Sequence, residues 1–135
     1  MSTTSSQGSK RPLSPFMIGP YYRPQLTSIL SITHRGTGVF LCAGALLLVW
    51  GCVALAAGQS DFATFVECLG SPLGTLAVIG FVYSLWFHFF NGLRHLGWDV
   101  GRGLELASAY SSGYAVMILT LLAGSATLWL IYLRS

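Results

Sequence analysis

Charged residues are scarce in this sequence. Asp, Glu, Lys and Arg make up 8% of the 135 residues, whereas hydrophobic residues make up 53%. Soluble globular domains carry roughly 25% charged residues. The low charge content therefore excludes an ordinary soluble domain, and we expect a protein that resides in a lipid bilayer.

The sequence also lacks the motifs that hold several redox cofactors. Its three cysteines, Cys42, Cys52 and Cys68, form no C-x-x-C or C-x-x-C-H pattern, which excludes a zinc knuckle and covalent haem attachment. There is no cysteine cluster and no glycine-rich dinucleotide fingerprint. We therefore do not expect this chain to hold an iron–sulfur centre or a flavin itself.

Long uncharged stretches are abundant instead. Residues 36–60, 68–93 and 106–133 contain no Asp, Glu, Lys or Arg. Each stretch is roughly 25 residues long, and a helix needs only about 20 residues to cross the hydrocarbon core. The sequence thus predicts an all-α integral membrane protein with three transmembrane helices, at about residues 30–57, 71–97 and 108–133.

The N-terminal segment differs in composition from the remainder. Residues 1–23 carry repeated prolines, which prevent a continuous helix. We expect this segment to form an arm that lies along the membrane surface or against a soluble partner, followed by a three-helix anchor domain at residues 24–135.

The basic residues predict the orientation of the chain. With three crossings, Arg134 lies on one side of the membrane and every other Lys or Arg lies on the side of the N-terminus. Because cytoplasmic flanks retain Lys and Arg, we expect the N-terminus inside and the C-terminus outside. The net charge of +3 is spread thinly along helix ends and forms no basic face, so we expect no nucleic-acid partner.

The start of the chain bears on localisation. No apolar run resembling the core of a cleavable signal occurs in the first 35 residues. The acid-free, Ser-rich start is compatible with import into an organelle, but it is short and holds only Lys10 and Arg11 as basic residues. We therefore prefer a multi-pass protein of a bacterial inner membrane to one of the mitochondrial inner membrane.

Three histidines lie toward one side of the expected membrane. His88 and His95 are seven residues apart, which is close to two helical turns, so they share one helix face. Gly92 lies between them on that face, where the missing side chain leaves room for a flat ligand. His34 lies at the corresponding end of the first span.

A histidine inside a membrane needs a partner, because an unpaired polar group in hydrocarbon costs several kcal/mol. One possibility is a hydrogen bond to a neighbouring helix, which holds the helices together. The other is haem iron, which binds neutral imidazole. We expect His88 to be an axial ligand of haem b, with His34, Arg35, Arg94 and His95 near the haem propionates.

The number of histidines has a further consequence. A haem held by two histidines needs a second imidazole at the depth of His88, and the third expected span contains none. The second ligand must come from another chain, either a different membrane subunit or a second copy of this one.

A second polar cluster lies at the start of the first span. Ser31 and Arg35 are one helical turn apart, and Ser28 lies about one turn earlier. A hydroxyl and a guanidinium together can bind a quinone carbonyl and stabilise its negative charge during reduction. A polar first turn at the membrane interface explains the same residues without a ligand.

Two segments resemble a known family. Residues 31–38 (SITHRGTG), preceded by residues 11–15 (RPLSP), and residues 88–99 (HFFNGLRHLGWD) are similar to the two signatures of the cytochrome b subunit of succinate dehydrogenase, the large membrane anchor of respiratory complex II. The resemblance implies that His88 is the haem axial ligand. It also implies that Ser31 and Arg35 belong to the ubiquinone site.

The resemblance also implies partners. A second membrane anchor subunit would supply the other haem ligand, an iron–sulfur subunit would dock on the inner face, and a flavoprotein subunit would oxidise succinate. Electrons would then reach ubiquinone or menaquinone at a site shared by several subunits. Two alternatives remain open: a haem anchor of another quinone-linked oxidoreductase such as fumarate reductase, and a non-redox membrane assembly protein.

Overall fold

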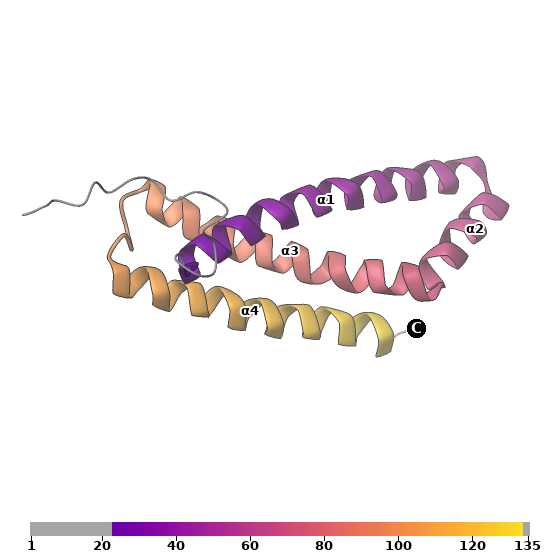
Figure 1. Cartoon of the computed structure of the whole chain (residues 1–135). Helices are drawn as coiled ribbons and strands as arrows, with labels where there is room; N and C mark the ends of the chain where they lie inside the picture. The colour runs from indigo at the N-terminus through magenta and orange to yellow at the C-terminus, as the bar shows by residue number, and fades with distance from the viewer. Residues whose placement is uncertain (1–22, 134–135) are drawn as a thin grey trace, which may run out of the picture.

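The computed structural model describes residues 23–133 and is helical over almost all of that range (Figure 1). Three helices, α1 (Leu26–Ala57), α3 (Pro72–Asp99) and α4 (Leu106–Leu133), are long and apolar enough to cross a membrane. The expected all-α fold with three transmembrane helices is therefore confirmed. Apart from Arg23, the predicted N-terminal arm lies outside the described residues.

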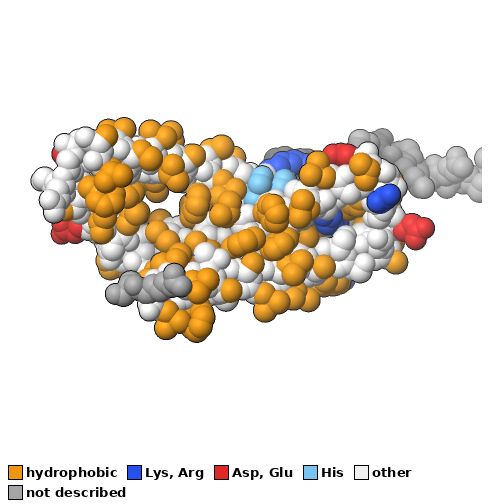
Figure 2. Space-filling model, turned by 180° about the vertical axis from the view of Figure 1, so that it is seen from behind, with side chains coloured by type: hydrophobic (Ala, Val, Ile, Leu, Met, Phe, Trp, Pro, Cys, Tyr) orange, Lys and Arg blue, Asp and Glu red, His pale blue; other side chains and the backbone are white. Residues whose placement is uncertain are grey.

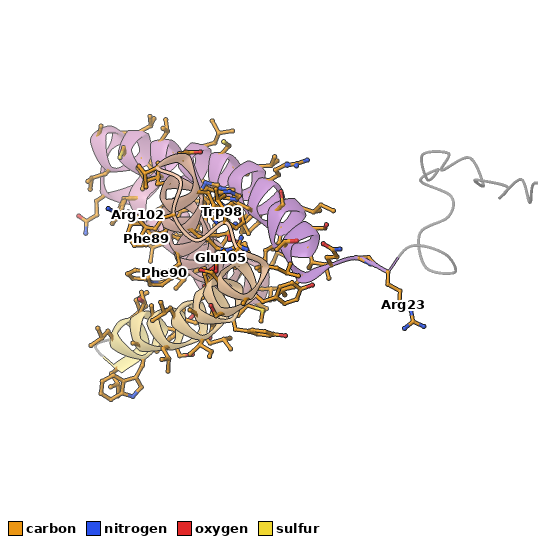
Figure 3. All side chains as sticks on the ribbon, turned by 90° about the vertical axis from the view of Figure 1, so that its left-hand side faces the viewer. Arg23, Phe89, Phe90, Trp98, Arg102 and Glu105 are labelled. Carbon is orange, nitrogen blue, oxygen red and sulfur yellow. The ribbon has the colours of Figure 1, made fainter. Side chains whose placement is uncertain are left out.

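The long helices lie alongside one another, and the chain runs the length of the bundle three times (Figure 1). α1 leads away from the end at which the described chain begins, α3 returns to that end, and α4 leads away again. We call this end the histidine end, because all three histidines lie in the halves of α1 and α3 that face it. The charged residues Arg23, Arg102 and Glu105 also lie there (Figure 3).

The connection between α1 and α3 is itself a helix, α2 (Gln59–Gly70), which the sequence did not predict. Gly58 separates α1 from α2 with a φ of +136°, a conformation that side chains with a Cβ rarely adopt. At the far end of α2, Ser71 caps α3 by accepting a hydrogen bond from the backbone N–H of Gly74 at 3.1 Å. Pro72 occupies the first turn of α3, where a missing N–H costs nothing.

Contacts between small and large residues hold the long helices together. At several glycines an added Cβ would collide with an aromatic ring or a leucine of a neighbouring helix, so the absent side chain is what permits the close approach. These pairs are Gly44 with Phe81, Gly113 with Leu30, and Gly124 with Tyr83.

Hydrogen bonds from the middle of α3 add to its contact with α4. Tyr83 and Ser125 share a hydrogen bond of 2.9 Å between their hydroxyls, and the indole N–H of Trp86 donates to Thr127 Oγ1 at 3.0 Å. Most large hydrophobic side chains instead face outward (Figure 2). That distribution suits a bundle surrounded by hydrocarbon, because lipid tails are as apolar as leucine.

Candidate functional site

The three histidines form one cluster between α1 and α3. The ring of His34 stacks on the ring of His88, with 3.9 Å between centroids and 9° between planes. The ring of His95 lies 5.1 Å from that of His34 at an angle of 50°. Figure 2 shows histidine side chains reaching the surface beside arginine, in otherwise hydrophobic surroundings.

The hydrogen bonds of His88 define its protonated nitrogen. Its Nδ1 lies 3.1 Å from the main-chain carbonyl oxygen of His34 and 3.4 Å from Thr37 Oγ1. A carbonyl only accepts, so Nδ1 carries the proton and donates it. In a neutral imidazole with this tautomer Nε2 keeps its lone pair, which is the state in which imidazole binds a metal. One nitrogen thus joins the two helices, while the other retains the capacity to bind a ligand.

Glycine makes room for this arrangement. A Cβ added at Gly38 would lie 3.0 Å from Cε1 of His88, so the ring packs directly against the backbone of α1. A Cβ added at Gly92 would lie 3.8 Å from Cε1 of His34. The space that the sequence predicted beside Gly92 therefore borders the ring of His34. Gly38 was not predicted, because only the closeness of α1 to α3 reveals its part.

His34 has a buried nitrogen without a partner. Its Nδ1 makes no hydrogen bond to any residue in the range 23–133, and a buried polar atom left unpaired costs about 1–3 kcal/mol. Buried polar atoms normally have a partner, so the unpaired Nδ1 of His34 beside the ring of His88 is expected where a further polar group binds.

The donor set indicates what kind of group fits this cluster. Within the described part of the chain, no group of three or more His, Cys, Asp or Glu side chains is arranged to hold a metal ion. In the neutral ring, Nε2 of His88 nevertheless has a lone pair with which to bind a metal. The residues therefore fit a metal that brings most of its ligands with it, as the iron of haem does.

Arg94 is directed toward α4. Its side chain is 8% exposed; Nε donates to Ser112 Oγ at 3.0 Å and Nη2 donates to the carbonyl oxygen of Ala109 at 2.9 Å. The guanidinium also lies 3.9 Å from the ring centroid of Trp98 (labelled in Figure 3). Arg94 thus joins α3 to α4 at the histidine end, and its predicted contact with haem propionates remains a prediction.

Asn91 links Arg94 to the histidines and was missed in the sequence. It is 0% exposed, its Oδ1 accepts from Arg94 Nη1 at 3.5 Å, and its Nδ2 lies 3.3 Å from Nε2 of His95. The signal that could have identified it is its position one turn before His95, as an amide within an otherwise apolar segment of helix.

The predicted quinone-site residues lie near the start of α1. Nη2 of Arg35 donates to Ser31 Oγ at 3.4 Å, so the two side chains meet as expected. Arg35 is exposed, whereas Ser28 and Ser31 are half-buried. Arg35 directly follows His34, so the two clusters share one turn of α1.

These features define a helical membrane protein with a histidine cluster between two of its long helices. Residues 7–127 match the family model described as "Succinate dehydrogenase/Fumarate reductase transmembrane subunit". The chain therefore belongs to this family and is a transmembrane subunit, which confirms the resemblance seen in its sequence.

Three relatives illustrate the similarity. The mitochondrial succinate dehydrogenase cytochrome b560 subunit of Homo sapiens is 40% identical over 118 residues, which cover 86% of this chain and 69% of the human protein. The succinate dehydrogenase cytochrome b556 subunit of Paracoccus denitrificans is 41% identical over 118 residues, 87% of this chain and 85% of that protein. The cytochrome b556 subunit of Rickettsia prowazekii is 34% identical over 114 residues, 84% and 87% of the two chains.

Proposed function

We propose that this chain is the membrane-anchor cytochrome b subunit of a succinate dehydrogenase, with haem b bound at His88 and a quinone bound beside Ser31 and Arg35. The observation that carries the proposal is the hydrogen bond from His88 Nδ1 to a main-chain carbonyl. It leaves Nε2 with its lone pair, as an axial ligand requires. The naming of the relatives as cytochrome b subunits supports the same cofactor.

Several residues of this chain would hold the haem, which supplies a one-electron carrier when bound. His88 would be one axial ligand. The polar side chains around it, His34, Arg35 and His95, would donate hydrogen bonds to the propionates. Nδ1 of His34 is buried and makes no hydrogen bond within residues 23–133, so such a bond would satisfy it.

The second axial ligand would come from a second membrane anchor subunit. The rings of His34 and His88 lie face to face at 3.9 Å, an arrangement in which both could not bind one iron, so His88 alone would hold the haem iron from this chain. α4 contains no histidine, so this chain supplies only one ligand.

The part that this chain would play in catalysis is quinone reduction. The Ser31 hydroxyl and the Arg35 guanidinium would bind a carbonyl oxygen of ubiquinone or menaquinone. A guanidinium carries a positive charge, so Arg35 would stabilise the negative charge that develops on that oxygen. Electrons would come from succinate through a flavoprotein subunit and an iron–sulfur subunit, because this sequence holds the motifs of neither centre.

The histidine end would face the cytoplasm or the equivalent mitochondrial compartment. The basic residues before α1 and between α3 and α4 support this orientation. It would place the quinone residues on the side where the soluble subunits dock. We propose a bacterial inner membrane as the location, with residues 24–135 as the anchor domain.

A difference spectrum tests the haem assignment. We expect the purified complex to show a b-type signal in its reduced-minus-oxidised spectrum, and His88→Ala to lose it while flavin and iron–sulfur signals remain. Tyr83→Phe on the same helix is the matched control, since it loses only a hydrogen bond to Ser125 and should keep the signal. An unchanged spectrum in His88→Ala would overturn the assignment.

A further inference from the structure

A continuous series of hydrogen bonds runs from α4 to the histidine cluster, although α4 contributes no histidine. It begins at the Ala109 carbonyl and Ser112 on α4, continues through Arg94 and Asn91 on α3, and ends at Nε2 of His95. Asn91 is the central member. It is the only large side chain that is fully buried among residues 23–133.

The direction of each hydrogen bond follows from its chemistry. Arg94 has only donors, so the atom of Asn91 that faces it is the oxygen, Oδ1. The Asn91 amide nitrogen must then face His95, and an amide nitrogen only donates. Nε2 of His95, at 3.3 Å from that nitrogen, is therefore an acceptor and carries no proton.

We propose that Asn91 is a positioning residue that holds His95 as a neutral imidazole with its proton on Nδ1. A proton on Nε2 of His95 would point at the N–H of the Asn91 amide, so two donors would face each other. The positive charge of Arg94 lies next to the same amide. Arg94 is itself held by α4, so the amide cannot turn over without losing its bond to the guanidinium. Arg94 and Asn91 thus connect α4 to the protonation of His95 on α3.

This arrangement assigns His95 a specific part at the site. It binds as a neutral donor through Nδ1–H, and it is not a cation. A group that accepts hydrogen bonds, such as a haem propionate, is therefore the partner that His95 fits. This consequence for the haem rests on the proposed function, whereas the protonation of His95 does not.

The protonation state is measurable without reference to activity. In the intact complex labelled with ¹⁵N-histidine, the signals of His95 are identified by comparison with the His95→Gln variant. We expect an unprotonated Nε2 and a protonated Nδ1. A protonated Nε2 in the unmodified complex would overturn the proposal, and this measurement needs no variant of Asn91.

Variants of Asn91 test the cause. A carboxylate only accepts, so Asn91→Asp should make Nε2 of His95 protonated. Ser112→Ala is the matched control: it removes one bond of Arg94 on α4, so it should lower thermal stability and leave His95 unchanged. A His95 signal that does not respond to Asn91→Asp would overturn the role of Asn91. If that variant fails to assemble, Asn91→Leu replaces it, and its loss of the amide donor should move the Nε2 signal.

A second measurement tests the consequence for haem. The midpoint potential of haem b should shift in Asn91→Leu and in His95→Gln. The double variant should shift it no further than the larger single shift, because both changes remove the same interaction between Asn91 and His95. Additive shifts would overturn the coupling. A complex with no b-type signal at all would refute the proposed function but leave the protonation of His95 standing.

Discussion

The main-chain carbonyl of His34 accepts a hydrogen bond from Nδ1 of His88 at 3.1 Å, across 54 residues of sequence. The two rings also stack, yet a stacked ring leaves the choice of protonated nitrogen open, whereas a carbonyl fixes it. The backbone of α1 thus orients the proposed haem ligand on α3. The side chain of His34 contributes packing and a nitrogen that makes no hydrogen bond within residues 23–133.

A side-chain change at His34 should therefore spare haem ligation. We expect His34→Ala to retain a b-type difference spectrum close to that of the unmodified complex, because the carbonyl remains in place when the ring is removed. The position of the signal should shift, since the stacking ring is lost. Loss of the signal, as expected for His88→Ala, would show that the ring of His34 is required and that the carbonyl is insufficient.

Gly38 offers a test of the space around His88. A Cβ at this position would lie 3.0 Å from Cε1 of His88, which is tighter than nine in ten real Cβ contacts. We expect Gly38→Ala to displace the imidazole and to lower the haem content of the purified complex, measured as haem per flavin.

Gly36→Ala is the matched control, because it lies two residues earlier on the same helix and its Cβ would meet nothing within 4 Å. It should leave the haem content unchanged, since alanine is also a better helix former than glycine. Equal haem losses in both variants would indicate a general effect on α1 and would contradict the argument from contact.

The fold could be predicted from composition to a large extent, and the reason is physical. A chain in hydrocarbon must pair its own backbone groups, so long uncharged stretches imply helices. The connection at α2 was missed because its 12 residues form no long uncharged stretch: they carry Asp61 and Glu67. Its ends depend on Gly58 and on the cap at Ser71, which are local backbone features.

The candidate site was predictable only where it lies along one helix. The shared face of His88 and His95 and the pairing of Ser31 with Arg35 follow from helical spacing. Contacts between helices do not, because they depend on how the helices are rotated and how closely they approach. For that reason the sequence did not indicate that Gly38 borders His88.

The quinone residues provide a prediction that separates binding from assembly. We expect Ser31→Ala and Arg35→Ala to lower quinone reduction by about 10²-fold, because each removes a donor to the developing negative charge. Succinate oxidation with a soluble artificial acceptor should be unchanged. Arg35→Lys should reduce quinone at a rate between those of Arg35→Ala and the unmodified complex, since it keeps the charge and loses the planar donor group. Equal losses of both activities would indicate failed assembly and contradict the assignment.

Arg94 should contribute to stability through α4. Its guanidinium is buried and reaches Ser112 Oγ at 3.0 Å and the carbonyl oxygen of Ala109 at 2.9 Å. A lysine at this position has a single nitrogen on a flexible stem, so it cannot make both bonds in the same geometry. We expect Arg94→Lys to cost about 1.5–3 kcal/mol, typical of hydrogen bonds to charged groups, and to lower the thermal denaturation midpoint of the complex.

The same exchange at Arg102 is the matched control, because that side chain is exposed at the histidine end (Figure 3). Arg102→Lys keeps the charge of the segment between α3 and α4, so membrane insertion should proceed as before. Its denaturation midpoint should equal that of the unmodified complex. If both exchanges lowered the midpoint equally, the effect would come from replacing any arginine at this end by lysine. The two bonds of Arg94 to α4 would then not explain the stability.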